Sequence, residues 1–327
     1  MAVLIIISGT FLSKFGDVIA DKTGLGQVLI GSILIALATS LPEMVTSVTS
    51  SITGAPDIAV GNVFGSNTFN LVILAIIDLF HGPGPLMLRI RYSHILSGLL
   101  GILLSGIVAF SIIVTHLTPI RLGFLGVGLD SIAIIFVYII GMRLVFRYEK
   151  KNPLDKDNEE KKEKPKNLTL KKAIIGFVIS GVIIVIAGIE LTIAGERIAS
   201  LTGLEQSFIG TIMIAAATSL PELVASISAM RINAYNMAFG NVMGSNIFNM
   251  IVVFFADIFY RQGFILTSVA SVHIITAMIG LMMSAIALIG LFYRSRRTIF
   301  TIGWDSLFIS IIYFIGVYLL FRLGVNF

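Results

Sequence analysis

The 327-residue sequence contains no cysteine, one tryptophan and four histidines, and only 13% of its residues are charged. The absence of Cys excludes disulfides and thiolate metal sites, and it leaves the redox compartment open. With 56% hydrophobic residues and a mean hydropathy of +0.98, the chain is also far too poor in polar residues for a soluble globular domain. The composition therefore indicates a polytopic membrane protein.

Apolar runs of about 20 residues recur along the chain, and each is long enough to cross a hydrocarbon core of roughly 30 Å as a helix. Barrel strands would be shorter and alternating, so a helical bundle is expected. The first run contains Lys14 and Asp17 and lacks the pattern of a cleavable signal, so we interpret it as the first helix. We predict an all-α protein with ten transmembrane helices at 2–20, 25–52, 57–81, 93–116, 120–146, 173–200, 205–230, 235–260, 264–293 and 300–323.

Two segments of the chain are copies of one another. A shift of 179 residues aligns positions 27–70 with 206–249 without a gap, and 24 of these 44 positions are identical. The phrase ATSLPE occurs in both copies, and GNVFGSNTFN in the first corresponds to GNVMGSNIFN in the second. The sequence is therefore an internal duplication.

The duplication predicts three parts: a first five-helix repeat at 1–146, a charged linker at 147–172 and a second five-helix repeat at 173–327. Because five is odd, the second repeat enters the membrane from the opposite side and the repeats are inverted. Eleven Lys and Arg residues lie between Arg143 and Lys172, so the positive-inside rule places the linker in the cytoplasm and both termini outside. We therefore attribute the excess of basic residues to membrane topology and not to binding of a nucleic acid. We expect a monomer in the lipid bilayer of the plasma membrane.

Glu43 and Glu222 each place a carboxylate inside an apolar run. A carboxylate at the bilayer centre costs at least a few kcal/mol and usually marks a functional site. The alternative is a protonated or salt-bridged Glu that holds two helices together, but no Lys or Arg lies in the neighbouring helical stretches. Inverted symmetry brings the two acids together near the midplane, where facing carboxylates require a cation.

Pro42 and Pro221 precede these acids directly. A Pro inside a helix removes one backbone hydrogen bond and frees carbonyls about four residues back, near Ala38 and Ala217. A simple kink would explain a lone Pro. The Thr, Ser and Glu residues clustered at both breaks favour a broken helix that lines an ion site.

In each repeat, the third predicted helix carries polar residues at a spacing of four, which puts them in a stripe on one face of the helix. The stripe comprises Asn62, Ser66 and Asn70 in the first repeat and Asn241, Ser245 and Asn249 in the second. The adjacent glycine pairs Gly61/Gly65 and Gly240/Gly244 predict close packing of helix backbones. The glycines require no more than packing, whereas the stripe offers neutral oxygen ligands beside the carboxylates.

The candidate site therefore contains only oxygen ligands. Calcium prefers six to eight oxygens in a flexible arrangement and sodium also takes oxygens, whereas soft transition metals prefer Cys or His. A dedicated magnesium cage is disfavoured because that ion retains its waters. No cofactor and no enzymatic reaction are expected.

The doubled SLPE and GNVxGSNxFN motifs resemble the alpha repeats of the cation/calcium exchanger superfamily, most closely its prokaryotic sodium/calcium exchanger branch. The resemblance covers all ten helices in order. It implies antiport of calcium against sodium by alternating access, with four central ion sites built by the second, third, seventh and eighth helices. Shared carboxylates that hold either calcium or sodium, but not both sets, would couple the two opposed fluxes.

The resemblance also implies roles for individual residues. Glu43 and Glu222 would bind calcium and share the flanking sodium sites, with backbone carbonyls from Thr39 and Thr218. Asn70 and Asn249 would complete the central group. The outer sodium sites would be lined by Ala36, Ser40 and Ser66 and by their repeat mates Ala215, Ser219 and Ser245.

The chain departs from the family pattern at two places. Ala38 and Ala217 stand where the motif usually begins with Gly, which stiffens the backbone at the break. Asn249 stands where archaeal relatives and the potassium-dependent branch often carry Asp. The missing carboxylate lowers the charge of the core by one and argues against potassium dependence.

Asp78 and Asp257 also obey the 179-residue offset and lie near the ends of the third and eighth helices. One hypothesis makes them cation-attracting acids, one at each mouth of the transport path. The alternative is an interfacial Asp paired with Arg89, Arg91 or Arg261.

Three other functions remain open at this point. Protons could replace sodium as the counter-ion, since they compete for the same carboxylates. A cation channel is a second alternative, although inverted repeats with broken helices favour a transporter. An intramembrane hydrolase is the weakest, because no His ligand or Ser/Lys pair accompanies the two acids.

Overall fold

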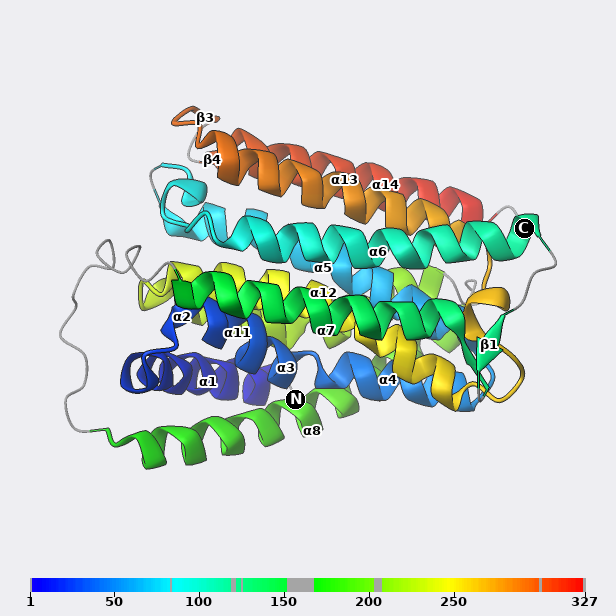
Figure 1. The fold of residues 1–327 in the computed structure, drawn as a ribbon, viewed down its shortest axis with the longest axis horizontal. Coiled ribbons are helices and arrows are strands. Elements are labelled where there is room, and N and C mark those ends of the chain that lie inside the picture. Colours follow the sequence, from blue (N-terminus) through cyan, green and yellow to red (C-terminus); the bar gives the residue numbers. More distant parts are fainter. Residues whose placement is uncertain are drawn as a thin grey trace.

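The computed structural model describes residues 2–82, 84–118, 122–124, 126–151, 168–202, 208–299 and 302–325. Figure 1 shows long helices lying side by side along the longest dimension of the molecule. In the described part of the chain, eight single helices are long and apolar enough to cross a membrane, and two bent pairs pass the same test together. The prediction of an all-α membrane protein with ten spans is confirmed.

The elements of the first half follow one another as α1 (Ala2–Thr23), α2 (Gly26–Leu29), the π-helix η1 (Ile30–Ile35), α3 (Ala36–Thr39), α4 (Leu41–Ile52), α5 (Pro56–His81), the 3-10 turn η2 (Leu86–Leu88), α6 (His94–Leu117), β1 (Gly123–Phe124), β2 (Val127–Gly128) and α7 (Leu129–Lys151). Those of the second half are α8 (Leu170–Thr202), the π-helix η4 (Ile209–Ile214), α10 (Ala215–Thr218), α11 (Leu220–Arg231), α12 (Tyr235–Phe259), η5 (Ile265–Thr267), α13 (Val272–Tyr293), β3 (Thr298–Ile299), β4 (Ile302–Gly303) and α14 (Trp304–Val325).

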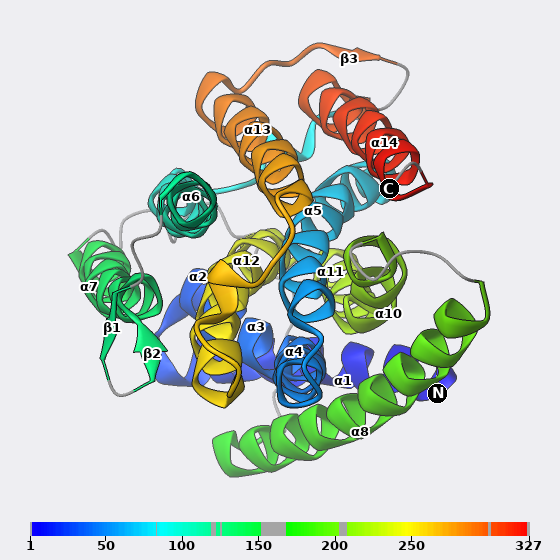
Figure 2. The same cartoon turned by 90° about the vertical axis from the view of Figure 1, so that its right-hand side faces the viewer.

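The broken helices and the two helices α5 and α12 occupy the centre of the bundle (Figure 2). In both α5 and α12, 72% of the most apolar window is buried, against 17% in α7 and 22% in α14. The latter two helices therefore face the lipid. The pair α1 and α8 packs side by side along one flank, while α6 with α7 and α13 with α14 cover the others. Burying polar residues is most costly at the centre of the bundle, so polar residues found there are the candidates for a functional site.

The two halves interlock at their glycines. Helix α5 packs on η4 and α12 packs on η1, so each third helix lies against the broken helix of the other half. A Cβ on Gly65 would overlap the backbone of Thr211, and a Cβ on Gly244 would overlap the backbone of Ser32. The small-xxx-small prediction is confirmed, since only glycine permits these backbone approaches.

Three helices begin later than predicted. The helices predicted at 120–146, 264–293 and 300–323 begin at Leu129, Val272 and Trp304. The short hairpins β1–β2 and β3–β4 and the turn η5 take up the preceding residues. These segments are themselves largely apolar and directly adjoin the helices, so hydropathy did not separate them, although Gly126, at φ +83°, marks the turn of the first hairpin.

Both ends of the segment predicted as a linker, 147–172, lie in helices. Helix α7 continues to Lys151 and α8 begins at Leu170, so the charged residues at both ends belong to helices. Residues 152–167 lie outside the described part of the chain.

Asp78 and Asp257 have neither of the roles weighed for them from the sequence. Both side chains are 1% exposed. Asp78 accepts hydrogen bonds from the backbone N–H groups of Leu86 and Gly303, at 2.7 and 2.8 Å. Asp257 does the same for Ile265 and Gly128, also at 2.7 and 2.8 Å. A buried carboxylate with both oxygens occupied by backbone donors cannot attract ions at a mouth; it anchors two connecting segments to the end of a central helix.

Candidate ion site

Each half contributes one broken helix to the site. Helices α3 and α4 meet at a bend of 43° and η4–α10 and α11 at a bend of 46°. The residue at each bend, Ser40 or Ser219, has left the helical region, with ψ of 7°. Pro42 and Pro221 lie in the first turn of the helix that follows, where a missing N–H costs nothing. The helix breaks predicted at the two prolines are confirmed.

The two carboxylates are fully buried in the first turns of α4 and α11, where the positive ends of the helix dipoles favour negative charge. Ser219 donates to Glu43 Oε1 at 3.0 Å, and Ser40 donates to Glu222 Oε1 at 2.7 Å. The second oxygen of each, Oε2, has no hydrogen-bond partner. No Lys or Arg of the described residues pairs with either acid. Two buried carboxylates thus stand close together, each with one free oxygen.

Asn70 and Asn249 contribute two further free oxygens. The amide nitrogen of Asn70 donates to Asn246 Oδ1 at 3.0 Å, and that of Asn249 donates to Asn67 Oδ1 at 2.9 Å. Both amide carbonyls, Asn70 Oδ1 and Asn249 Oδ1, are buried without a partner. Unsatisfied buried acceptors are rare in folded proteins and call for an explanation. A bound cation supplies one.

The first residues of the two stripes, Asn62 and Asn241, hold the broken helices in place. Asn62 Nδ2 donates to the backbone carbonyl of Glu43 at 3.3 Å and to Ser47 at 3.0 Å. Its Oδ1 accepts from Thr218 at 3.2 Å. Asn241 repeats these contacts with Glu222, Ser226 and Thr39 at 3.3, 3.0 and 3.3 Å. These amides hold the broken helices in place and leave no free oxygen.

The remaining predicted site residues lie around this centre. Ser245 donates to Glu222 Oε1 at 3.4 Å, and Ser66 lies 3.3 Å from the Thr218 hydroxyl. The carbonyls of Ala36 and Ala215 accept the backbone N–H groups of Ser40 and Ser219 at 2.9 and 3.0 Å. Each of these carbonyls also accepts a hydroxyl of its own half, from Thr39 at 3.4 Å and from Thr218 at 3.2 Å. The structure brings all twelve predicted residues to the two breaks and the helices beside them.

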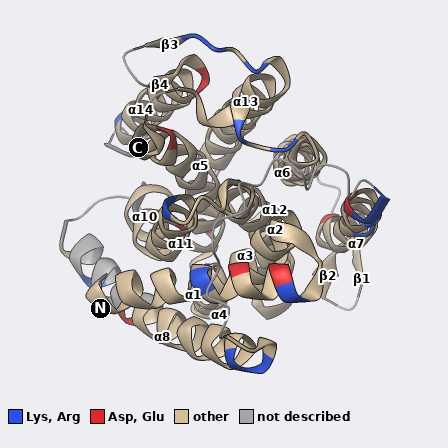
Figure 3. Ribbon diagram, turned by 90° about the vertical axis from the view of Figure 1, so that its left-hand side faces the viewer, with Lys and Arg blue, Asp and Glu red and all other residues tan. Residues whose placement is uncertain are grey.

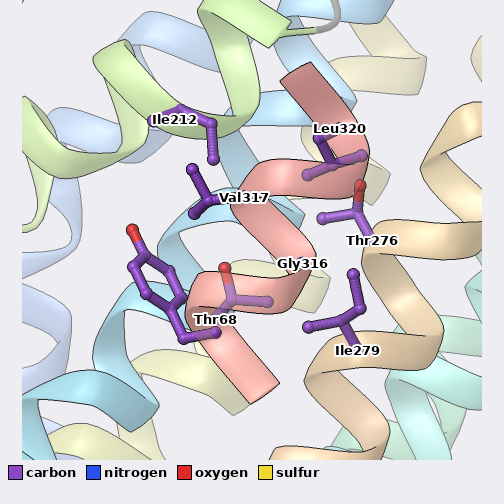
Figure 4. A pocket seen from close by; sticks show the side chains of 8 residues that line it. Thr68, Ile212, Thr276, Ile279, Gly316, Val317 and Leu320 are labelled. Atoms are coloured by element: carbon purple, nitrogen blue, oxygen red, sulfur yellow. The ribbon is translucent and has the colours of Figure 1, made fainter. Parts of the chain in front are cut away.

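Two small cavities flank the centre at related positions of the two halves. Figure 4 shows the one between α5, η4, α13 and α14, where Ile212, Val317 and Leu320 point into the space. Its lining is mainly apolar, with Thr68 and Thr276 as the labelled hydroxyls, so it does not offer a cation a ligand set. The other cavity reaches Ala36 and is lined further by Ser32, Ile33, Leu37, Tyr138, Met142, Gly244, Ile247 and Phe248.

Sequence reasoning missed Asn67 and Asn246, although both lie in the repeated GSN motif. They stand three residues before Asn70 and Asn249 and therefore lie off the four-residue stripe. The signal that could have found them is the repeat itself, since both copies keep an amide at this position. Ser47 and Ser226, which receive the Asn62 and Asn241 amides, also share the offset of 179 and were missed too.

The donor set suits a hard cation. Among the described residues, no group of three His, Asp or Glu side chains comes together, so the centre has only two acids. Its other free groups are neutral oxygens. Such a set matches calcium or sodium, which accept carboxylates, amides and hydroxyls together. Broken helices from inverted halves that meet at buried acids are typical of secondary transporters.

Comparison with known families agrees with that class. The model of the family described as "Sodium/calcium exchanger protein" matches residues 1–147 and 172–324. The chain belongs to this family, and the predicted relationship to the exchangers is confirmed. It is a family of membrane transporters rather than enzymes.

Individual relatives extend the comparison. The chain is 25% identical over 287 residues to the sodium/calcium exchanger MaX1 of Methanosarcina acetivorans, covering 77% of this chain and 78% of that one. It is 29% identical over 239 residues to the putative antiporter CaxA of Alkalimonas amylolytica, covering 72% and 70%. A solved structure of the sodium-calcium exchanger NCX_Mj superimposes with a TM-score of 0.69 at 22% identity, covering 97% and 94%. That likeness establishes the shared fold.

Proposed function

We propose that the protein is a secondary active antiporter that exchanges calcium for sodium across a membrane by alternating access. The observation that carries this proposal is the set of four buried oxygens without a partner: Glu43 Oε2, Glu222 Oε2, Asn70 Oδ1 and Asn249 Oδ1. Two come from each repeat, and two carry formal charge. A dehydrated calcium ion would satisfy all four, with further oxygens from Thr39 and Thr218.

The coupling of the two fluxes follows from charge. The two carboxylates supply a total charge of about −2, which one calcium or two sodium ions can balance. Loading both sets would leave uncompensated positive charge in a medium of low dielectric constant, which is costly. Sodium would take the outer positions beside Ala36, Ser40 and Ser66 and beside Ala215, Ser219 and Ser245. An exchanger therefore needs to move only between its calcium-loaded and sodium-loaded states.

Helices α1 and α8 are suited to be the moving part. They pack on each other along one flank of the bundle and contact the broken helices from outside. Ser13 donates to the Ala225 carbonyl at 2.8 Å, and Thr10 lies 3.1 Å from the Ser228 hydroxyl, so α1 is hydrogen-bonded to α11 in this conformation. Sliding of the pair along the central helices would exchange such contacts and open the site to the other side.

We further propose a topology in which the linker side is cytoplasmic and both termini are outside. Figure 3 looks onto one end of the bundle, where Lys and Arg residues are spread over several helix ends and the loop at β3. Such an accumulation is typical of the cytoplasmic face. The two five-helix repeats at 1–146 and 173–327 would then be inverted copies around the midplane, in a monomer of the plasma membrane.

The decisive experiment measures calcium uptake into proteoliposomes with an outward gradient of sodium, potassium or protons. We expect uphill uptake driven by sodium, and its loss in Glu43→Gln. Asp57→Asn is the matched control, because it removes one carboxylate of the same half outside the site. Uptake driven only by protons would identify the counter-ion as H⁺, uptake that never exceeds equilibrium would identify a channel, and coupled uptake that survives Glu43→Gln would overturn the proposed site.

A further inference from the structure

Asn67 and Asn246 form a reciprocal pair across the boundary between the halves. Asn67 Nδ2 donates to the backbone carbonyl of Asn246 at 3.4 Å, and Asn246 Nδ2 donates to the backbone carbonyl of Asn67 at 3.3 Å. Both side chains are buried, at 5% and 6% exposure. Neither provides a free oxygen to the ion site.

This pair determines which way two neighbouring amides point. A backbone carbonyl can only accept, so the nitrogen of each paired Asn must face it. The oxygen Asn67 Oδ1 is thereby turned to Asn249, and an oxygen requires a donor opposite. Asn249 must present its nitrogen there, as it does at 2.9 Å, and its carbonyl must then point the other way. Asn246 turns Asn70 in the same manner, at 3.0 Å.

We propose that Asn67 and Asn246 are positioning residues that set the amide orientation of Asn249 and Asn70, so that carbonyl oxygens rather than N–H₂ groups face the bound cation. The inference deepens the proposed function and rests on it. With the opposite orientation, two amide donors would point at a cation and repel it. Hydrogen-bond partners behind a metal ligand commonly hold that ligand in its binding orientation.

The arrangement is crossed between the repeats. Asn67 of the first half orients Asn249 of the second, and Asn246 of the second orients Asn70 of the first. The ligand oxygens of either half are therefore set correctly only when the other half is docked. Each positioning residue also has one specific target, which a general packing role would not have.

The test uses this crossed specificity in a double-mutant design on the purified full-length protein, with calcium binding measured by calorimetry in detergent. We expect Asn67→Ala and Asn246→Ala each to weaken calcium binding roughly 10- to 100-fold. An Asp has oxygen at both ends and needs no orientation. In the Asn249→Asp background, Asn67→Ala should therefore cause no further weakening, while Asn246→Ala keeps its full effect. In the Asn70→Asp background the pattern should reverse.

Thr68→Ala is the matched control, because it trims a neighbouring buried side chain whose hydroxyl only donates to Gly65 O of its own helix. Should an Asp background fail to fold, Asn249→Ala and Asn70→Ala replace it, since an absent amide cannot be misoriented either. Equal losses from Asn67→Ala in all backgrounds would show a packing role and overturn the inference. If the wild-type protein bound no calcium, or Glu43→Gln left binding unchanged, the proposed function itself would fail.

Discussion

The two halves of this protein are nearly identical at the ion site and differ where they reach the ends of the bundle. At the centre, each Ser at a helix break bonds to the Glu of the other half. Asn62 and Asn241 each hold the break of their own half through the Glu backbone carbonyl and a Ser hydroxyl. One deviation is that Ser245 donates to Glu222, whereas its mate Ser66 lies against Thr218.

The difference outside the centre is larger. Asp57, at the start of α5, accepts hydrogen bonds from the Ala270 N–H at 2.7 Å and from His273 at 3.0 Å. Its repeat mate is Asn236, which accepts the Arg91 N–H at 2.8 Å. Both repeats thus keep a polar acceptor that holds a loop, but only the first carries a charge there. This pattern is expected if a shared cation requires the centre to stay symmetric while the ends, in the proposed inverted topology, meet different sides of the membrane.

The largest expected effect is loss of a central acid, and it should be the same in both halves. Glu43→Gln and Glu222→Gln each remove half of the negative charge, so we expect sodium-driven calcium uptake to fall at least about 100-fold in either variant. Proteoliposome flux measures this. A strong loss in one variant with near-normal flux in the other would show that the two carboxylates do not share a single site.

The next effect concerns the crossed packing of the central helices. A Cβ on Gly65 or Gly244 would overlap backbone atoms of the opposite half, so Gly65→Ala and Gly244→Ala should each lower the free energy of unfolding by about 3 kcal/mol or prevent folding. Thermal denaturation in detergent compares them. Gly106→Ala on α6 is the control, because nothing lies within 4 Å of its added Cβ. Equal midpoints for all three variants would contradict the interlocked centre.

A smaller effect is expected at the acids that anchor the connecting segments. Asp78→Asn and Asp257→Asn each exchange one acceptor oxygen for a donor that faces a backbone N–H, so a loss of about 1–3 kcal/mol in stability is expected. Calcium affinity measured separately from each side of the membrane should not change. A one-sided loss of affinity in either variant would restore the role at a transport mouth and refute the anchoring role.

Much of the candidate site could be predicted from the sequence because its residues are polar and lie inside apolar segments. Glu43 and Pro42 are conspicuous inside a membrane helix, and their repetition at a fixed offset predicts that the two copies meet at one centre. Hydropathy cannot predict features that depend on the orientation of a side chain. Nothing in the letters Asn67 or Asn70 tells which amide provides an oxygen and which turns it, because that depends on the carbonyl opposite.

The boundaries of the outer helices were missed for a related reason. The segments before α7 and α14 are apolar, and their sequences predict helix. In the structure they form hairpins whose N–H groups at Gly128 and Gly303 bond to Asp257 and Asp78, which lie 129 and 225 residues away in the chain. Such long-range contacts leave no periodicity in the local sequence. Aligned acids near the ends of central helices are the one clue, and their anchoring role could not be told from a transport role without the structure.

The smallest expected effect would make the two ends of the molecule alike. Asp57→Asn gives the α5 end the side chain that α12 has at Asn236, while keeping an oxygen for the Ala270 N–H. Ala270 and His273 both bond to Asp57 Oδ1, so Asn keeps the acceptor and loses only its charge. Asp57 is 25% exposed and its His273 partner is fully buried, so this loss should cost only about 1 kcal/mol of stability. Sodium-driven flux should stay within about twofold, since about 0.4 kcal/mol corresponds to that factor.

The reverse exchange, Asn236→Asp, completes this comparison. Asn236 is only 6% exposed, and the His94 ring beside it lies tilted against the Phe239 ring with centroids 5.0 Å apart. A charge placed at this buried position should cost more stability than Asp57→Asn does, by about 1–2 kcal/mol in thermal or denaturant unfolding. If instead the two exchanges cost the same, the two ends would be equivalent environments, and the charge at Asp57 would have no structural reason to lie on one side only.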